Sequence, residues 1–416
     1  MTFIADDLAA WAVELDPAEQ DLELADRALL DTVAVAVAAR EHPVLTVAAG
    51  LSEAARWAVA GHVLDFDDLH MGSTTHISVV CVPAALSVSG GARAYLAAAG
   101  VMARLGLVLG WPHYAAGWHA TCTAGAPAAA VGAAIALGLD AAGVATAMAL
   151  AVPAAGGVQR AFGTDAKSLQ VGFAAEAGVR AARLAAAGAT ADVRAVDSWL
   201  GLLGADSARV DLSGPAVPGG LAIKLFPCCY ALQRPISALA GLAAHGIDPA
   251  TVDRVVLRTP QGTVTPLIHH RPDTGLQAKF SLEYAAATAL LDPYQGFASF
   301  TDQAVRRPEA RRLLELVEVQ LTVGGDWLLA GELDVEVHVG REVYRARSTY
   351  PPGSPQQPPT YDQLERKVGD CLLGTGLDPD TIDWSHAPDL LRRYLPSAAH
   401  PPSHRHAAGE EFLWRG

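Results

Sequence analysis

LGLVLGWPHYAAGWHATCTAGAPAAAVGAAIALGL, residues 105–139, contains no Asp, Glu, Lys or Arg. An uncharged run of this length is long enough to cross a membrane. However, Pro112 and Pro127 interrupt it, His113 and His119 add polar groups, and its many Ala and Gly residues make it only weakly hydrophobic. We therefore expect this stretch to form the buried core of a helical protein and not a membrane span.

The sequence on both sides of this run also has helical periodicity. Apolar residues from Leu22 to Val37 recur three or four positions apart, the spacing of one helix face. The Ala-rich pattern continues from residue 92 to residue 187, and no alternation typical of strands occurs before about residue 220. Residues 1–219 are therefore predicted to form the first part of a large helical domain.

The pattern changes after residue 220. A helical stretch at 236–244 is followed by a β-branched run at 252–257, and residues 315–323 and 335–339 alternate between apolar and polar side chains. Gly340 then separates 335–339 from 343–348, which predicts a hairpin with one solvated face. Residues 220–358 are therefore predicted to be α+β, residues 359–396 to return to helix, and residues 397–416 to form a mobile tail.

Composition excludes several classes of function. The 416-residue chain is 51% hydrophobic and has a formal net charge of -14, without the clustered Lys and Arg of a nucleic-acid footprint. Its first residues carry Asp6, Asp7 and Glu14 and lack the basic start and apolar core of a secretory signal. Five scattered cysteines without a C-x-x-C motif suggest reduced thiols, so we expect a cytoplasmic protein.

Acids and histidines are concentrated between residues 61 and 78. The group comprises His62, Asp65, Asp67, Asp68, His70 and His76. If residues 54–69 form one helix, His62, Asp65 and Leu69 share a face. The cluster fits a divalent-metal site, an acid/base site, or a helix end with solvated acids, and spacing alone leaves the three open.

Three more polar residues lie in apolar surroundings. His119 follows Gly117 and Trp118 inside the uncharged run, where it is either a core histidine or a titratable site group. Lys167 and Lys224 each lie in an apolar stretch. Because a cation in such surroundings is costly unless paired, each lysine is expected to meet an acid of the protein or a carboxylate of a ligand.

Six motifs together resemble the MmgE/PrpD family. They are HVLDFDD at 62–68, THIS at 75–78, GWHAT at 117–121, Lys167, KLFPCC at 224–229 and AKFSLEY at 278–284. The resemblance extends from about residue 5 to residue 395. The family includes 2-methylcitrate dehydratase, cis-aconitate decarboxylase and iminodisuccinate epimerase, so the resemblance implies an enzyme of small carboxylic acids.

The resemblance also implies a fold and a site. It implies a mainly α protein, in which a smaller α+β lid domain is inserted into a large all-helical domain, and a homodimer without metal or organic cofactor. The active site is expected in the cleft between the two domains. The residues that match family site positions are Asp65, His76, His119 and Tyr284 as catalytic groups and Lys167 and Lys224 as substrate-binding groups.

The sequence departs from the family pattern at positions expected to face the substrate. Leu69 stands where the family often has Thr, and Gln233 stands where a histidine commonly follows the KLFPCC motif. Ile77 and Phe226 replace Pro and Tyr of the pattern. The scaffold is therefore expected to be retained while the pocket around Leu69 and Gln233 has changed.

The implied chemistry is removal of a proton next to a carboxylate. Lys167 and Lys224 would hold substrate carboxylates and stabilise the developing charge. His76 and His119 would be base and acid in either order, Asp65 would orient a histidine, and Tyr284 would donate a proton. We expect a cofactor-independent lyase of dehydratase or decarboxylase type acting on a small polycarboxylate. The alternatives are an epimerase of a dicarboxylate and a catalytically silent binding protein.

Overall fold

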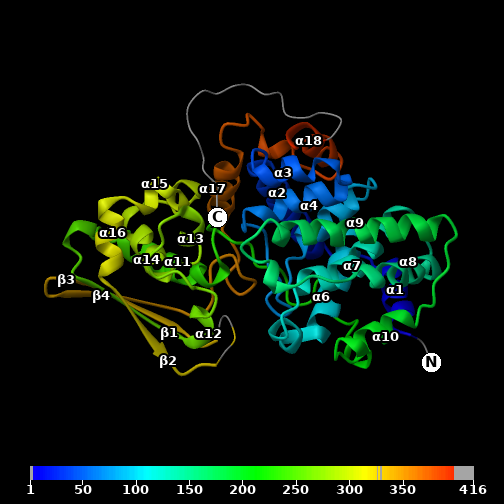
Figure 1. Ribbon diagram of the computed structural model, residues 1–416, viewed down its shortest axis with the longest axis horizontal. Coiled ribbons are helices and arrows are strands. Elements are labelled where there is room, and N and C mark those ends of the chain that lie inside the picture. The colour runs from blue at the N-terminus through cyan, green and yellow to red at the C-terminus, as the bar shows by residue number, and fades with distance from the viewer. Residues whose placement is uncertain (1–2, 326, 328–329, 398–416) are drawn as a thin grey trace.

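The computed structural model describes residues 3–325, 327 and 330–397. The predicted mobile tail therefore lies, apart from Ser397, outside the described residues. A large helical body and a smaller α+β region lie side by side (Figure 1). The fold class predicted from the sequence is confirmed.

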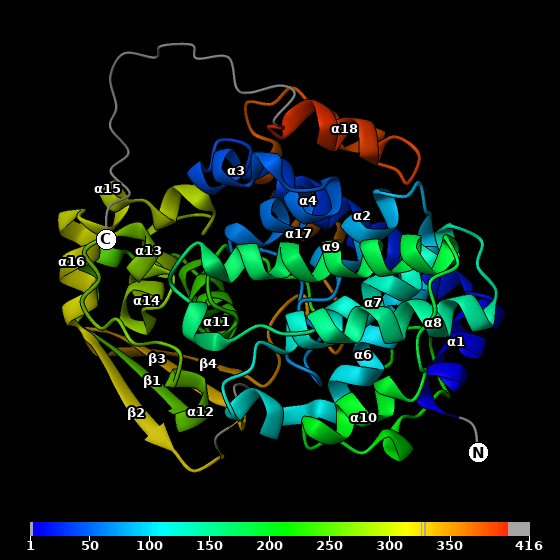
Figure 2. The ribbon, with the colours of Figure 1, turned by 45° about the vertical axis from the view of Figure 1, so that its right-hand side comes forward.

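Within the described residues, ten α-helices precede the α+β region. They are α1 (Ile4–Glu14), α2 (Glu19–Ala38), α3 (Pro43–Val47), α4 (Glu53–Val63), α5 (Ser78–Leu86), α6 (Ala92–Ala115), α7 (Ala120–Ala136), α8 (Ala141–Ala151), α9 (Ala166–Ala186) and α10 (Ala195–Leu202). The body is completed by α17 (Tyr361–Leu372) and α18 (Ala387–Tyr394), which pack against α2 (Figure 2). Its core contains residues from both parts of the chain, among them Leu29, Val131, Val368 and Leu391.

The helices pack closely because small residues line their contacts. A Cβ added at Gly178 of α9 would lie 2.4 Å from the Cβ of Ala129 in α7. A Cβ added at Gly132 of α7 would lie 2.8 Å from the Cβ of Ala98 in α6. Since the side chains at a contact set the distance between helix axes, the Ala- and Gly-rich composition permits this close approach.

The uncharged run forms the end of α6 and all of α7. Gly110, with φ 60°, kinks α6, and the segment through His119 turns the chain into α7. Among the described helices, α6 alone is long and apolar enough to cross a membrane, and 78% of its apolar window is buried inside the protein. The predicted core position is therefore observed for the α7 part of this stretch, whereas Leu107, Trp111 and Leu137 are exposed.

The α+β region is built on a four-stranded sheet of order β2-β1-β3-β4. Its strands are β1 (Arg254–Pro260), β2 (Val317–Thr322), β3 (Leu333–Val339) and β4 (Glu342–Ser348). β1 and β2 are parallel and the other pairs are antiparallel. The predicted hairpin is present, with Leu333 paired to Ser348 and Gly340 at the turn with φ 58°.

The α+β region also contains six described α-helices, of which α11 and α14 pack on one face of the sheet. The six are α11 (Gln233–Ala243), α12 (Gln261–Val264), α13 (Gly275–Ala278), α14 (Leu282–Leu291), α15 (Asp302–Val305) and α16 (Pro308–Glu315). Val335 and Val337 of β3 point into the core beneath α11 and α14. On the other face Glu336 pairs with Arg258 and Arg345, so the alternation read from the sequence matches one buried and one solvated face.

Candidate active site

The chain leaves α4 through an unusual turn at Asp65. α4 ends at Val63, Leu64 caps it, and Asp65 has a φ of 57°. Aspartate is one of the few residues other than glycine that adopt this left-handed conformation. The condition of one helix through Leu69 is therefore not met, because Asp65 and Leu69 lie in the loop beyond the helix and do not share its face with His62.

Lysines from distant parts of the chain surround this turn. Lys167, in the first turn of α9, donates to Oδ1 of Asp65 at 2.9 Å. Lys224 donates to the same oxygen at 3.1 Å and to the Asp65 carbonyl at 2.8 Å. Lys279, which follows α13, donates to the carbonyl of Leu64 at 3.1 Å. The turn of the helical body is therefore held by one cation from that body and two from the α+β region.

The charges in this lysine cluster are unbalanced. Burial opposes the charge of Asp65, but Lys167 and Lys224 outweigh it and hold the pKa of Asp65 well below its usual range. Burial likewise opposes the charge of Lys224, yet Asp65 raises its pKa. The pKa of Lys279 is lowered to about 8, mainly by burial. The charges of Lys224 and Lys167 add to this decrease, and Asp65 offsets only part of it. Three cations meet one carboxylate, which leaves an excess of positive charge.

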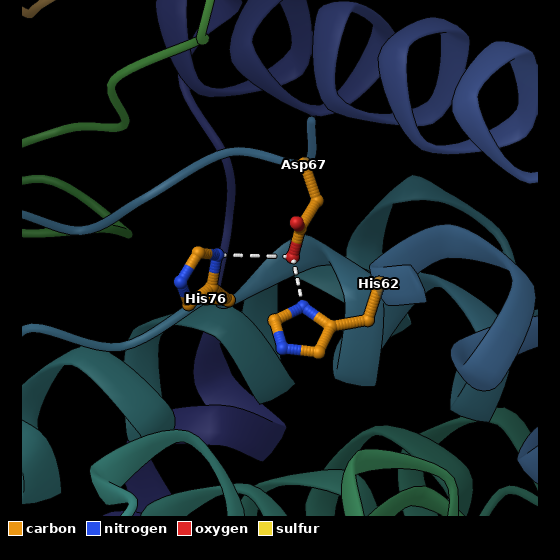
Figure 3. Close-up of side chains that lie close together, drawn as sticks. All are labelled: His62, Asp67 and His76. Carbon is orange, nitrogen blue, oxygen red and sulfur yellow. Dashed lines mark hydrogen bonds and ion pairs between the residues drawn. The ribbon is translucent and has the colours of Figure 1, made fainter. Parts of the chain in front are cut away.

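A second carboxylate, Asp67, faces two histidines. Nδ1 of His62, from α4, lies 2.8 Å from Oδ2 of Asp67, and Nδ1 of His76 lies 3.0 Å from the same oxygen (Figure 3). Burial would raise the pKa of Asp67, but the two imidazoles hold it well below its usual range. Burial lowers the pKa of His62 to about 4. Near neutral pH Asp67 is therefore an ionised acceptor and His62 is neutral.

His119 is the third imidazole of the site. It occupies the cap position before α7, and its ring centroid lies 5.8 Å from that of His62. Phe162 packs edge-on against it at 5.0 Å, and Nζ of Lys167 lies 5.7 Å from the Phe162 ring. Burial, reinforced by the other two histidines and Lys167, holds the pKa of His119 well below its usual value.

Buried polar contacts fix the loop that carries these groups. The amide of His76 donates to Oγ1 of Thr121 at 3.0 Å. Asp68 accepts from the side chain and the amide of Ser78 at the start of α5. Lys367 of α17 donates to the carbonyl of Phe66 at 2.9 Å. The loop is thus anchored from α5, α7 and the C-terminal helices.

The structure brings together five of the predicted site residues. These are Asp65, His76, His119, Lys167 and Lys224. It corrects one predicted role, because Asp65 pairs with the lysines while Asp67 is the acid that meets His76.

Three predicted positions lie elsewhere. The hydroxyl of Tyr284 donates to the carbonyl of Ser299 at 2.5 Å within the core of the α+β region, so the structure does not place it with the histidines. Gln233 is fully buried and accepts from the amides of Leu225 and Phe226, so it supports the Lys224 loop from behind.

Leu69 is the third of these positions. Its backbone pairs with that of Ala222 at 2.9 and 2.8 Å, and its side chain packs against Ala222 and Tyr230. Leu69 therefore belongs to the contact between the Asp65 loop and the Lys224 loop. The contacts observed for Leu69 and Gln233 are with backbone and core, and their contact with substrate stays a prediction.

Sequence reasoning missed Lys279, although a signal was present. Only four of the 30 lysine and arginine residues are lysines, and they are Lys167, Lys224, Lys279 and Lys367. Three surround the Asp65 turn and the fourth bonds to the next residue, Phe66. The rarity of lysine would have singled out all four.

One group of side chains could hold a metal ion. His62, Asp67 and His76 offer donor atoms that all lie within 4.8 Å of one another, and imidazole with carboxylate suits several transition metals. Both Nδ1 atoms also lie at hydrogen-bond distance from one oxygen of Asp67, which suits a carboxylate that accepts two N–H groups. The donor set is compatible with a bound metal ion and with a hydrogen-bonded group that holds no metal. The expected independence from metal stays a prediction.

Comparison with known families agrees with this geometry. Residues 52–211 match the model of the MmgE/PrpD N-terminal domain, and residues 226–378 match that of the MmgE/PrpD C-terminal domain. The chain belongs to the MmgE/PrpD family. Both family domains are thus present, and the lysine and histidine clusters draw on both: His62, Asp67, His119 and Lys167 lie in the first matched range, and Lys279 lies in the second.

Two curated proteins show similarity over shorter stretches. The MmgE/PrpD chain is 30% identical over 174 residues to cis-aconitate decarboxylase of Mus musculus, an alignment that covers 38% of this chain and 35% of that protein. It is 28% identical over 117 residues to an endochitinase of Persea americana, covering 28% of this chain and 35% of that protein. The chain therefore matches about a third of the length of each relative.

Proposed function

We propose that this MmgE/PrpD protein is a cofactor-independent lyase that acts on a small polycarboxylate by removing a proton next to a carboxylate. The observation that carries the proposal is the excess of lysine charge around Asp65 beside three imidazoles. Buried cations without matching anions favour an anionic ligand, and a di- or tricarboxylate supplies the missing charge. The similarity to a decarboxylase of a tricarboxylic acid agrees with this class of substrate.

The neighbouring groups suit carbanion chemistry. Ammonium groups that bind a substrate carboxylate also stabilise the negative charge that this carboxylate takes up when the α-proton leaves. A histidine oriented by a buried carboxylate is a common general base, and Asp67 with His76 forms such a pair at 3.0 Å. Lys167 and Lys224 therefore bind and stabilise, while the histidines handle protons and hydrogen bonds.

Three reactions pass through a similar carbanionic or enolic species. In elimination the C–H electron pair forms a C=C bond and hydroxide leaves with a proton as water. In decarboxylation a C–C bond breaks, CO2 leaves, and the carbon receives a proton. In epimerisation the proton is removed and replaced on the opposite face. We favour a lyase, with epimerisation of a dicarboxylate as the alternative.

A silent binding protein and a glycosidase have less support. Gln233 departs from the family pattern but holds the backbone of the Lys224 loop, so its presence removes no group from the lysine and histidine clusters. Glycoside hydrolysis needs two carboxyl groups that face one sugar. Here Asp65 is committed to lysines and Asp67 to histidines, so neither of these two acids is free for that reaction.

Turnover of a panel of acids tests the proposal. The purified protein would be incubated in D2O with di- and tricarboxylates, including cis-aconitate and citrate, and followed by proton NMR for α-deuteration, water addition or loss, and CO2 release. Lys167→Met and Lys224→Met should each raise KM and lower kcat, because carboxylate binding acts in both the ground state and the transition state. Arg194→Met, which removes an exposed cation paired with Asp192, is the matched control.

The outcomes separate the candidates. Gain or loss of water or CO2 identifies the lyase, and α-deuteration with inversion of configuration but without such a change in composition identifies the epimerase. Thermal stabilisation by an acid without exchange or conversion would support the silent binding protein. We further propose that the protein is a cytoplasmic homodimer. Size-exclusion chromatography with light scattering would measure its oligomeric state.

A further inference from the structure

Gln170 makes a direct contact with a site histidine that the proposed function leaves unexplained. It lies one turn after Lys167 on α9, and its Nε2 is 2.7 Å from Nδ1 of His119. Sγ of Cys122 is 3.3 Å from the same nitrogen. Nδ1 of His119 therefore has two neighbours from its own protein, which leaves Nε2 as the nitrogen available for chemistry.

A second contact fixes the orientation of the Gln170 amide. Its Oε1 accepts from the amide of Val158 at 3.0 Å, and its Nε2 is 3.3 Å from the Val158 carbonyl. Rotating the amide by half a turn would place an NH2 group against the N–H of Val158 and an oxygen against the Val158 carbonyl. Since both of those contacts would be repulsive, Nε2 must face His119 and donate to Nδ1.

The direction of this bond sets the tautomer of His119. A neutral imidazole carries one proton, and a nitrogen that accepts a hydrogen bond does not hold it. Nδ1 accepts from Gln170, so the proton of His119 must be on Nε2. A second proton on Nδ1 would collide with the NH2 of Gln170, which disfavours the imidazolium form as well.

His76 has the opposite arrangement. Its Nδ1 is 3.0 Å from Oδ2 of Asp67, an ionised carboxylate that can only accept, so in the neutral form of His76 this carboxylate favours a proton on Nδ1 and a free lone pair on Nε2. His62 faces Asp67 in the same way, but its side chain is fully buried, whereas that of His76 is 13% exposed. Of these two histidines, His76 is the one that can meet a substrate.

We propose that Gln170 is a positioning residue that holds His119 as the neutral Nε2–H tautomer, so that His119 donates a hydrogen bond to substrate and His76 is the base. The assignment of steps rests on the proposed function. The α C–H bond breaks, its proton moves to Nε2 of His76, and its electron pair enters the adjacent carboxylate. His119 keeps its proton and stabilises the oxygen that gains charge, a role open to a neutral imidazole.

Nitrogen NMR of histidine reads the tautomer without any substrate. Protein labelled with 15N-histidine would be recorded with long-range proton–nitrogen correlation, which distinguishes protonated from unprotonated ring nitrogens. The His119 and His76 signals would be assigned with His119→Gln and His76→Gln. We expect the proton of His119 on Nε2 and that of His76 on Nδ1. Finding His119 protonated at Nδ1, or at both nitrogens near neutral pH, would overturn the proposal.

Variants of Gln170 separate the effect on His119 from support of the loop. Gln170→Glu keeps an oxygen for the Val158 amide but places an acceptor on Nδ1, so the His119 proton should move to Nδ1. Gln170→Met removes the donor and should give a mixture of tautomers. The control is Gln159→Met, which removes two bonds to the carbonyls of Tyr114 and Trp118 but none to His119. Unchanged His119 signals in both Gln170 variants would refute the assignment.

Activity provides a separate readout once an acid that turns over is found. Gln170→Glu should lower kcat by about 10²-fold with KM within about threefold, the cost of losing one donor to a developing oxyanion. A kcat within about threefold of that of wild type in a variant whose tautomer has changed would refute the role of His119 as donor. If His119 shows the expected tautomer but no acid is converted, the role of Gln170 stands and the proposed function fails.

Discussion

Replacing Lys367 with methionine should destabilise the protein by several kcal/mol. Lys367 belongs to α17 and connects this C-terminal helix to the loop that carries the site. Lys367 and Asp31 form an ion pair in which each side chain is only 1% exposed. The same ammonium donates to the carbonyl of Phe66 at 2.9 Å and lies 4.2 Å from the centroid of its ring. Lys367→Met keeps the length of the side chain and removes all three interactions.

The size of the effect follows from the charge left behind. Burial already outweighs Lys367 and raises the pKa of Asp31. Without Lys367 the carboxylate would bind a proton, and neutralising a group of pKa 3.8 at pH 7 costs about 4 kcal/mol at 1.36 kcal/mol per unit. Breaking a buried ion pair from one side typically costs about 3–5 kcal/mol. We expect a loss in this range in the free energy of unfolding.

The loss should depend on pH in a defined direction. A carboxyl group whose pKa is higher in the folded than in the unfolded protein binds more protons when folded, so its contribution to stability falls as pH rises. The deficit of Lys367→Met relative to wild type should therefore be largest near neutral pH and shrink on acidification toward about pH 4, with a slope of at most about 1.4 kcal/mol per pH unit.

Urea unfolding followed by tryptophan fluorescence would measure this deficit at about pH 4.5 and about pH 7.5. Lys367→Met combined with Asp31→Asn is the matched control, because the neutral amide removes the stranded charge and with it the pH dependence. A loss below about 1 kcal/mol at the higher pH, or a loss that grows on acidification, would refute the reasoning.

Three other predictions concern the site. Asp67→Asn should lower kcat/KM by about 10²–10⁴-fold, because an amide cannot hold the His76 tautomer as a carboxylate does. The control is Asp68→Asn, a change at the acid that contacts Ser78, and its kcat/KM should stay within about threefold of that of wild type. Equal losses in the two variants would contradict this. Citrate affinity measured by calorimetry should weaken as pH rises through about 8, where Lys279 loses its proton, and an unchanged profile in Lys279→Met would count against that assignment. Turnover should survive exhaustive chelation, and a stoichiometric transition metal required for activity would overturn the mechanism.

Local sequence patterns were sufficient for most of the fold. Alternation placed β3 and β4, and glycine at 340 marked their turn. The end of α4 was not predictable in this way, because HVLDFDDLH continues a helical pattern. Lys167 and Lys224 form hydrogen bonds with Asp65 although they lie 102 and 159 residues further along the chain. Contacts between residues so far apart in sequence leave no periodic signal in it.

The site was predictable as a set of residues but not as a set of pairs. The motifs gathered residues that lie together, yet they assigned to Asp65 the place beside His76 that Asp67 holds, two positions further along the same loop. Motif order also placed Tyr284 among the catalytic groups although its hydroxyl bonds to Ser299. A motif fixes where a residue lies along the chain, whereas the direction of its side chain depends on elements that the motif does not contain.

The choice of lysine over arginine fits the way in which the site is assembled. An ammonium is a compact charge whose pKa shifts when buried, whereas a guanidinium needs a planar, bidentate partner and stays charged. Three ammonium groups can therefore converge on one turn, and Lys279 can lose part of its charge there. Lys224 and Lys279 come from the α+β region while Asp65 and Lys167 belong to the helical body. The positive charge that would bind a polycarboxylate is thus complete only when the two regions pack together, so substrate binding and packing of the regions must stabilise each other.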